Sequence, residues 1–427
     1  MPKIRITEVD KTGRVQASAI SNVVYMPVRL NVDGATQVQK AEAGVLSDLA
    51  LFRSADDFKA AADSEIVIYG VQGSEGKKIP VISPDSLGYK LCVHLLNLGF
   101  EVLVEALSDS ETPNWTKLED RSLYDVRFFT LGAFTEGATY TNGVIDTSKT
   151  CFNMTGEVQN MISTAAKRGD CIALVNADEN ATGYSYTVSD VRSSFDSLSD
   201  GEYAAAFSPW FYTKNSDFTT DGTEVKIPAA FGYLFAYANA TKNNPEWYAI
   251  AGFERGIIPE LSKVCHSFTT AEIEVLQARS AEAEVALDDS ADNVGYAINP
   301  ICYVRPAGNI IYGNRTLRVN DASKKLIASS FLNIRNGLSA IKKVMYEASR
   351  KYTFEQNTET LWINFQSYVT PLLDRMQSGN GILGYTFIRQ RTDAKARLKA
   401  RLNLVPVEAV EDFDLEVYLT DDLTVSE

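Results

Sequence analysis

Strand-like and helix-like segments alternate through the middle of the chain, and this rhythm limits the fold more than any other feature. From about residue 120 onward, runs typical of strands or helices follow one another: Asp125–Leu131, Glu157–Lys167, Cys171–Val175, Val188–Leu198, Tyr203–Phe211 and Ala229–Ala240. The run Cys171–Val175 is apolar at every position, as in a strand buried on both faces. The alternation predicts a parallel sheet covered by helices on both sides, which we place in a middle α/β domain at residues 110–300.

Residues 23–109 predict a smaller α/β region before that domain. Ser54–Ala62 reads as a helix with Ser54 as its N-cap, and Pro84–Leu98 as a helix ending at Gly99. Ile66–Tyr69 and Val102–Val104 read as short strands. The glycine-rich loop 70–78 after the first of them resembles a phosphate-binding loop, but its spacing is wrong and no helix follows it. We therefore interpret this loop as a plain turn.

The last third, residues 301–427, predicts two long helices followed by extended segments. Asp321–Lys351 gives the longest helical signal, because its apolar residues recur at steps of three and four. A second helix over Glu359–Met376 begins after Asn357 or Thr358 and ends at Gly379. Phe387–Arg389 and Arg397–Val407 read as strands. We treat this part as a separate C-terminal domain that ends in a strand.

Both ends of the chain carry alternating patterns typical of strands. Near the N-terminus Ile4, Ile6 and Val9 are the expected contact residues of an arm formed by residues 1–22, and near the C-terminus Leu415, Val417 and Leu419 lie on one side of a strand. Each strand must find a hydrogen-bonding partner. Either both pair within their own subunit, or they are arms that add strands to the sheets of neighbouring subunits. The pattern alone leaves both readings open.

Composition argues against several classes of function. The 427 residues hold 41 Lys and Arg against 55 Asp and Glu, a net charge of −14, which disfavours non-specific binding of nucleic acid or anionic membranes. Two histidines and five widely spaced cysteines give no metal-binding or catalytic spacing. The longest apolar stretch, at residues 229–240, is too short to span a bilayer. We therefore expect no catalytic residue, no metal, no cofactor and no enzymatic activity.

One basic stretch stands out in this acidic chain. Its residues include Arg389, Arg391, Lys395, Arg397 and Lys399. They form either a solvated face whose long side chains cover apolar surface, or an electrostatic contact with an acidic partner protein. Composition leaves these two readings about equal.

The order of segments resembles the contractile phage tail sheath family over nearly the whole chain. The most specific part is Gly295–Leu317, which ends in the signature Gly313-Asn314-Arg315-Thr316-Leu317. The family's Phe-Glu-x-Asn step is similar to Phe354–Asn357, and its Leu-Trp pair to Leu361-Trp362. Upstream landmarks of the family are similar to Ser208-Pro209-Trp210 and Glu254-Arg255-Gly256.

This resemblance implies a structural subunit of the virion. Family sheaths stack as six-fold rings around a tail tube, exchange β-strands between subunits, connect to baseplate and tail terminator proteins, and contract to drive the tube through the bacterial envelope. The resemblance implies that the middle domain points outward, resembles a subtilisin-like α/β layer without a catalytic triad, and is inserted between the N-terminal and C-terminal parts of an assembly domain that carries extended strand arms at both termini. Assembly is expected in the cytoplasm of the host bacterium. Part of the basic stretch, or the helix carrying Trp362, is expected to face the tube.

Two alternatives stay open. The chain could serve as the sheath of a phage-derived injection particle instead of a virion. In a different class, the middle α/β domain could act as a hydrolase or nucleotide-binding enzyme, since a fold alone does not settle function.

Overall fold

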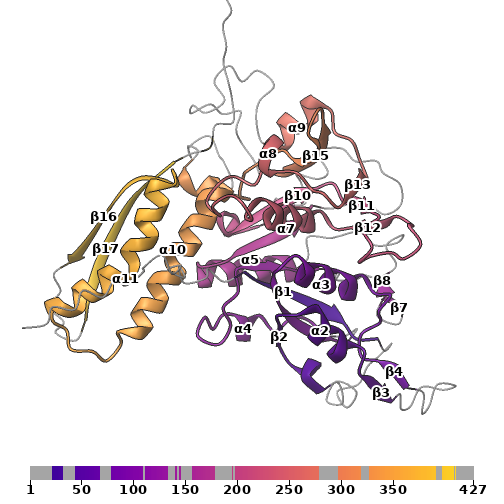
Figure 1. The fold of residues 1–427 in the computed structure, drawn as a ribbon, viewed down its shortest axis with the longest axis horizontal. Helices are drawn as coiled ribbons and strands as arrows, with labels where there is room; N and C mark the ends of the chain where they lie inside the picture. The colour runs from indigo at the N-terminus through magenta and orange to yellow at the C-terminus, as the bar shows by residue number, and fades with distance from the viewer. Residues whose placement is uncertain are drawn as a thin grey trace, which may run out of the picture.

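The computed structural model describes residues 22–31, 44–67, 78–108, 111–132, 140–141, 144–145, 156–177, 195, 198–277, 297–318, 327–390, 397–407 and 409. Its centre is an eight-stranded sheet in the order β15-β14-β10-β9-β6-β1-β5-β2 (Figure 1). The bounds of these strands in chain order are β1 Val23–Arg29, β2 Ala50–Phe52, β5 Glu101–Leu107, β6 Phe128–Thr130, β9 Ile172–Asn176, β10 Ala204–Ser208, β14 Asn299–Val304 and β15 Gly308–Ile311. The inner strands pair in parallel, while β2 and β15 pair antiparallel at the two edges.

Helices cover both faces of this sheet, as the alternating pattern predicts. Neighbouring residues of β6 show the two faces, because successive side chains of a strand point to opposite sides. The Phe128 ring packs against Tyr237 of α7 (Ala229–Ala240), and Phe129 lies beneath Arg168 of α5 (Gly156–Arg168). Helix α3 (Leu87–Asn97) lies with α7, since His94 contacts Phe235.

The central strand β1 was not predicted. All seven of its residues are buried, and Val24 pairs with Val102 of β5 on one side and Phe128 of β6 on the other. Pro27 has no backbone N–H to donate to a neighbouring strand. A proline in a sequence segment therefore argues against an inner strand. Only the pairing of β1 with β5 and β6 identifies this segment as a strand.

The predicted boundary between regions 23–109 and 110–300 falls inside this single sheet. Strands β1, β2 and β5 come from the first region, β6, β9, β10 and the first two residues of β14 from the second, and the rest of β14 with β15 from the third. One hydrophobic core extends from Val23 to Leu332. The reason is that parallel strands are ordered by crossover connections, so sequence neighbours need not share a separate core.

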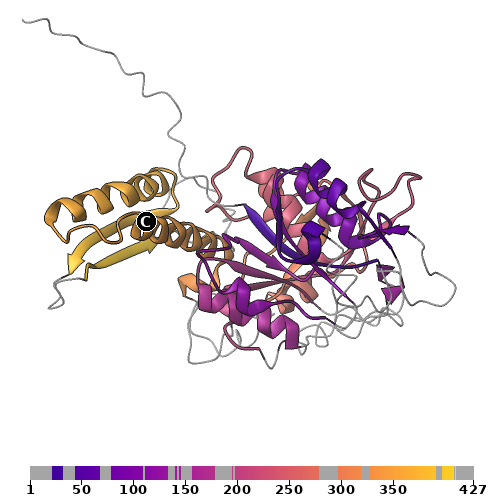
Figure 2. The ribbon, with the colours of Figure 1, turned by 90° about the horizontal axis from the view of Figure 1, so that it is seen from below.

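Residues 332–406 form a C-terminal subdomain on one side of the sheet, projecting from the body in two perpendicular views (Figures 1 and 2). It consists of α10 (Leu332–Lys351), α11 (Glu359–Ser378) and the antiparallel pair β16 (Ile382–Gln390) and β17 (Lys399–Pro406). A second core, which includes Ile341, Phe365 and Phe387, lies between these helices and the two strands. We call the rest of the described chain the α/β body.

Local signals place most of the helix ends. Ser54 caps α2 (Ala55–Ala62), Thr358 caps α11, and Thr269 with Glu272 forms a capping box at α9 (Thr270–Leu276). Gly99 follows α3 with a φ of 93°, which glycine adopts readily. Smaller elements complete the body: η1 Gly44–Ser47, β3 Glu65–Val67, β4 Lys78–Pro80, α4 Trp115–Leu118, β7 Tyr140–Thr141, β8 Val144–Ile145, η2 Gly201–Tyr203, β11 Phe211–Thr213, β12 Val225–Ile227, α8 Gly252–Arg255, β13 Leu261–Val264 and η4 Ala328–Ser330.

Two predicted elements differ in extent. The long helix predicted from residue 321 begins at Leu332, because Phe331 is extended and forms a β-bridge with Arg315. The strand predicted over 203–211 is divided at Pro209 into β10 and β11, which belong to different sheets. The helix predicted at 188–198 lies, apart from residues 195 and 198, outside the described residues.

Candidate assembly surfaces

The predicted signature residues form a buried joint between the sheet and α10. The Asn299 side chain of β14 donates from Nδ2 to the carbonyl oxygens of Ala206 (3.0 Å) and Arg315 (2.9 Å), and its Oδ1 accepts from the Arg315 N–H at 2.8 Å. Gly313 lies so close that a Cβ at this position would be 2.8 Å from that Oδ1. A side chain at residue 313 would therefore displace Asn299.

The remaining signature residues continue the joint toward α10. The Arg315 guanidinium lies 4.7 Å from the centre of the Phe331 ring, just before the helix begins. The Thr316 N–H donates to Ser330 O at 2.9 Å, and the Leu317 N–H donates to Ala204 O at 2.8 Å. Gly313, Arg315, Thr316 and Leu317 therefore act in the fold of the subunit.

Polar contacts from Asn336 and Lys343 fix α10 to the body. The Asn336 Nδ2 donates to the Tyr233 hydroxyl at 2.6 Å, and Lys343 binds Asp125 and the Val126 carbonyl. Since α10 belongs to both cores at its two ends, it connects the body and the subdomain through one rigid element.

Trp247 extends from the body into the subdomain, and our sequence analysis did not identify it. Its indole Nε1 donates to Gly379 O at 3.1 Å, and its ring lies 5.4 Å from the Arg375 guanidinium. The ring covers Gly381, where a Cβ would lie 2.5 Å from the indole. Its signal in the sequence is weak, because nothing distinguishes it from the other three tryptophans.

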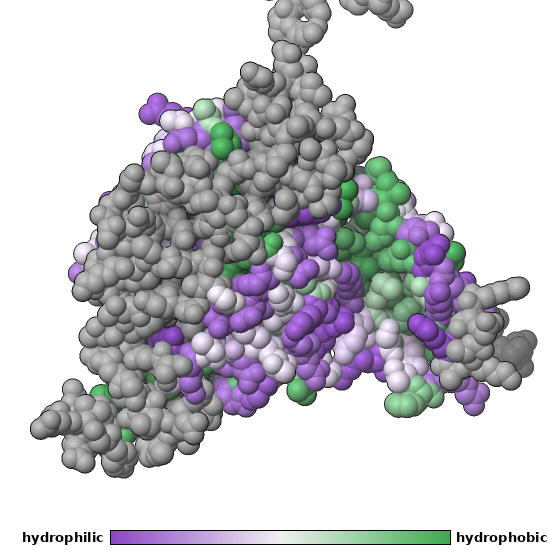
Figure 3. All heavy atoms as spheres, turned by 180° about the vertical axis from the view of Figure 1, so that it is seen from behind, coloured by the Kyte–Doolittle hydropathy of each residue, from purple (hydrophilic) through white to green (hydrophobic). Residues whose placement is uncertain are grey.

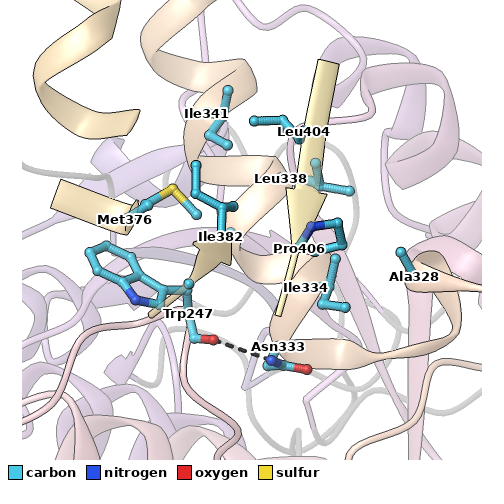
Figure 4. A pocket seen from close by; sticks show the side chains of 12 residues that line it. Trp247, Ala328, Asn333, Ile334, Leu338, Ile341, Met376, Ile382, Leu404 and Pro406 are labelled. Carbon is cyan, nitrogen blue, oxygen red and sulfur yellow. Dashed lines mark hydrogen bonds between the residues drawn. The ribbon is translucent and has the colours of Figure 1, made fainter. Parts of the chain in front are cut away.

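An open apolar pocket lies beside Trp247 (Figure 4). Its volume is about 180 Å³. We call it the Trp247 pocket, and its lining residues are Trp247, Ala328, Asn333, Ile334, Gly337, Leu338, Ile341, Met376, Gly381, Ile382, Leu404 and Pro406. Hydrophobic residues also gather on the back of the molecule where the subdomain meets the body (Figure 3). Most of the residues that line the pocket are apolar, and they come from both the body and the subdomain.

The β16–β17 sheet is open on both sides. Within the described part of the chain it contains only these two strands, so each has one edge without a paired strand. In β17 the residues alternate between exposed and half-buried, and Leu402 and Leu404 face the second core. Unpaired edges of this length are templates for strand addition.

The predicted basic residues gather at the outer end of the subdomain. Arg389 forms an ion pair of 2.8 Å with Glu359 and donates to Asn357 Oδ1 at 2.7 Å, while the Arg397 carbonyl accepts from Asn357. Lys399 begins β17 and is exposed. Arg391 and Lys395 lie outside the described residues.

Charge separates the subdomain from the rest of the chain. Residues 332–406 hold 12 Lys and Arg against five Asp and Glu, a net charge of +7. The remainder holds 29 Lys and Arg against 50 Asp and Glu, a net charge of −21. The subdomain is therefore suited to contact acidic protein surfaces.

Trp362 is not part of that surface, contrary to the predicted tube-facing role. Trp362 is 6% exposed, stacks on Phe365 and contacts the tilted ring of Phe387 in the second core. The sequence pattern predicted the helix α11, but it did not show which face of the helix β16 covers. The predicted arm residues Ile4, Ile6, Val9, Leu415, Val417 and Leu419 lie outside the described residues and stay predictions.

Cys92, Cys171 and His94 are packed in the interior. Burial raises the pKa of the Cys92 thiol well above its ordinary value, and that of Cys171 to about 12. His94 is buried against Phe235, with Nδ1 2.7 Å from Asp217 Oδ2. Across the described ranges, no group of three or more His, Cys, Asp or Glu residues could hold a metal ion. No helix in those ranges is long and apolar enough to cross a membrane.

Comparison with known proteins identifies the fold. No protein-family model matches the sequence, and neither does any curated protein sequence. Among solved structures, the chain is similar to a chain of the contracted PVC sheath complex from an extracellular contractile injection system, with a TM-score of 0.59 and 14% identity over 99% of this chain and 98% of that one. The contracted helical sheath of the anti-feeding prophage matches with a TM-score of 0.57 and 14% identity over 99% of both chains.

The fold is that of contractile sheath proteins. A chain in the six-fold symmetrised baseplate structure of the anti-feeding prophage is also similar, with a TM-score of 0.59 and 11% identity over 95% of this chain and 94% of that one. The sheath fold therefore includes both the α/β body and the C-terminal subdomain, and the sequence resemblance to sheath proteins is confirmed at the level of the fold.

Proposed function

We propose that this chain is the structural subunit of a contractile sheath that polymerises around a tail tube and contracts to drive the tube through a bacterial envelope. The observation that carries the proposal is the similarity to the helical sheath over 99% of both chains. The open strand edges and the basic subdomain support it, because both are surfaces that a neighbouring protein can cover. The polymer would store the energy of contraction in its packing, as metastable assemblies do.

The first test is electron microscopy of the purified protein in negative stain. Tubes or stacked rings are expected. Compact monomers at every concentration, with and without a co-expressed tube protein, would refute the proposal.

The terminal arms are proposed to add strands to β16 and β17 of neighbouring subunits. Two arms per chain match the two open edges of its sheet, and main-chain hydrogen bonds supply the contact without specific side chains. Deleting residues 1–12 should abolish long polymers and leave a folded monomer, measured by microscopy and circular dichroism. Sheaths of normal length from the deletion variant would contradict this role.

The basic outer end of the subdomain is proposed to face the tube. Reversing two charges with Arg397→Glu and Lys399→Glu should weaken tube-templated assembly without unfolding the subdomain. Reversing Arg53 and Lys78, which are exposed on the body, is the matched control. Equal assembly of both double variants would remove this assignment.

The proposed sheath function covers two cases: the sheath of a virion and the sheath of a phage-derived injection particle. The similar structures that are described above are of a prophage and of an extracellular injection system, which supports the second form. The neighbouring genes distinguish them, because a virion also needs capsid and terminase genes. Loss of either form leaves the sheath proposal intact.

A further inference from the structure

The last strand of the subdomain brings the chain to the Trp247 pocket. Pro406, the last residue of β17, lines the pocket (Figure 4). The Val407 N–H then donates to the carbonyl oxygen of Gly381, another lining residue, at 3.2 Å. The described chain stops at residue 409, and the sequence continues over residues 410–427, which we call the C-terminal segment. This segment is therefore tethered a few residues from an open apolar pocket.

The pocket suits an aromatic ring. Its volume of about 180 Å³ exceeds the roughly 150 Å³ of an apolar cavity that binds benzene. Leu338, Ile341 and Met376 line it from α10 and α11 (Figure 4). A phenyl ring placed here would remove apolar surface of the ring and of the pocket from water, which stabilises the contact.

The length of chain after Pro406 selects Phe413 as the occupant. A reversal of the chain takes about four residues, the length of one β-turn. Val410 follows Pro406 by four residues, so the turn uses all of them and leaves none for the return. Phe413 follows by seven residues, so three remain for the return, about 10 Å of extended chain. Phe413 is therefore the first bulky apolar side chain of the C-terminal segment that can enter the pocket.

Charge favours the same segment. It holds seven Asp and Glu and no Lys or Arg, whereas residues 332–406 have a net charge of +7. Asp412 and Asp414 flank Phe413 in the sequence. The guanidinium of Arg375, an exposed residue, lies 5.4 Å from the centre of the Trp247 ring beside the pocket. Because the segment is joined to the subdomain by its own backbone, this attraction acts at a high effective concentration and needs no second molecule.

We propose that the C-terminal segment docks on its own subdomain in the unassembled subunit, with Phe413 in the Trp247 pocket. The contact is autoinhibitory, because a segment held in this way is not free to add a strand to the sheet of a neighbour. The docking follows from the pocket, the reach and the charge of this chain. The autoinhibition rests in addition on the proposed sheath function, in which the segment is a terminal arm.

Intrachain cross-linking tests the docking. The full-length double variant Phe413→Cys, Leu338→Cys is oxidised in dilute solution, and peptide mass spectrometry distinguishes the new disulfide from any that the five native cysteines form. The control is Phe413→Cys, Ile363→Cys, because Ile363 is exposed and precedes Met376 on α11 by 13 residues, about 20 Å along the helix. We expect about tenfold more intrachain disulfide in the first variant, since docking holds the two sulfur atoms together. Equal yields would overturn the proposal.

The same chemistry identifies any other occupant of the pocket. If the mixed single variants Phe413→Cys and Leu338→Cys cross-link between chains as much as the double variant does within one chain, a second copy fills the pocket and the proposal fails. The residues before Ala328 are the other candidate, because Ala328 also lines the pocket. If Leu326→Cys pairs with Leu338→Cys and Phe413→Cys does not, that part of the chain fills the pocket and the proposal also fails.

Assembly measurements test the autoinhibition. Phe413→Ala should shorten the lag before tubes form by about fivefold, because docking no longer competes with assembly. Val425→Ala, in the same segment, is the matched control and should leave the lag unchanged. The oxidised Phe413→Cys, Leu338→Cys variant should form no tubes until a reductant opens the disulfide. Equal lags for wild type and Phe413→Ala, or tubes from the oxidised variant, would overturn the autoinhibition.

Failure of the docking and failure of the sheath function give different results. If the intrachain disulfide forms and wild-type protein makes no tubes, the sheath proposal is overturned and the docking stands. If wild-type protein makes tubes and the intrachain disulfide does not exceed the control, only the docking is overturned. Absence of both tubes and excess disulfide overturns both.

Discussion

The α/β body and the C-terminal subdomain complete their sheets in different ways. In the body, strands from three parts of the sequence form one sheet of eight, with helices over both faces. In the subdomain, two strands that are close in sequence pair with each other, and in the described part of the chain no third strand extends their sheet. The difference teaches that the body builds a large sheet from segments far apart in the sequence, whereas the subdomain has a two-stranded sheet in which each strand has one edge that another segment can extend.

The largest expected effect tests whether the interior of the α/β body is shielded from solvent. Arg127 is 1% exposed and lies 2.8 Å from Glu246, so Arg127→Met leaves a buried carboxylate without its partner. We expect the free energy of unfolding to fall by about 4 kcal/mol, measured by urea denaturation. The exposed pair of Arg53 and Glu101 is the control, where Arg53→Met should cost less than about 1 kcal/mol. Similar losses in both variants would show that the Arg127 pair is not effectively buried.

The second prediction tests whether the subdomain can loosen on its own. Trp362→Ala removes a stacked ring from the smaller core and should cost about 3 kcal/mol. Amide exchange should increase in α11 and β16 and stay unchanged in β1 and β5, because the body has a separate core. Uniform acceleration across all four elements would mean that the two regions unfold together.

The third prediction uses acid to probe a contact within the body. Burial alone would raise the pKa of Asp217, but hydrogen bonds from His94 and Asn97 hold it below its ordinary value of 3.8. A lowered pKa in the folded state gives stability that is present above pH 4 and is lost as the pH falls through the folded value. Asp217→Asn should cost about 1 kcal/mol at pH 7, since the carboxylate is partly exposed, and should have less effect at pH 2. A constant difference between the variants from pH 7 to pH 2 would contradict it.

The smallest effect compares matching helix caps in the two regions. The Ser54 hydroxyl accepts hydrogen bonds from the N–H groups of Asp56 and Asp57, and Thr358 accepts one from Leu361. Replacing either cap with alanine should cost about 1 kcal/mol in thermal unfolding. Ser54→Ala should lower the transition of the body, and Thr358→Ala that of the subdomain. An identical change in every transition would argue against separate cores.

Local chemistry allowed much of the secondary structure to be predicted. The caps Ser54 and Thr358 and the glycine after α3 mark helix ends through contacts within a few residues. The apolar run at β9 identified a doubly buried strand. These features depend on neighbouring residues, and a single sequence contains them in full.

The candidate surfaces were harder to predict because they depend on distant residues. The basic stretch was identified from charge alone, but the burial of Trp362 depends on how Phe387 of β16 packs across α11. The Trp247 pocket combines a body loop, two helices and two strands. The residue pattern of a single segment cannot predict a pocket that several distant segments form together.

The sequence by itself determined the helix caps, the alternation of strands and helices, the charge contrast of the C-terminal third and the resemblance to sheath proteins. Only the tertiary structure decided that β1 lies inside one sheet between β5 and β6, that Asn299 and Gly313 join that sheet to α10, and that Trp247 reaches into the subdomain. The physical reason is the range of the interactions. Caps and periodicity act over one or two turns of the chain, whereas strand order and core packing bring together residues more than a hundred positions apart.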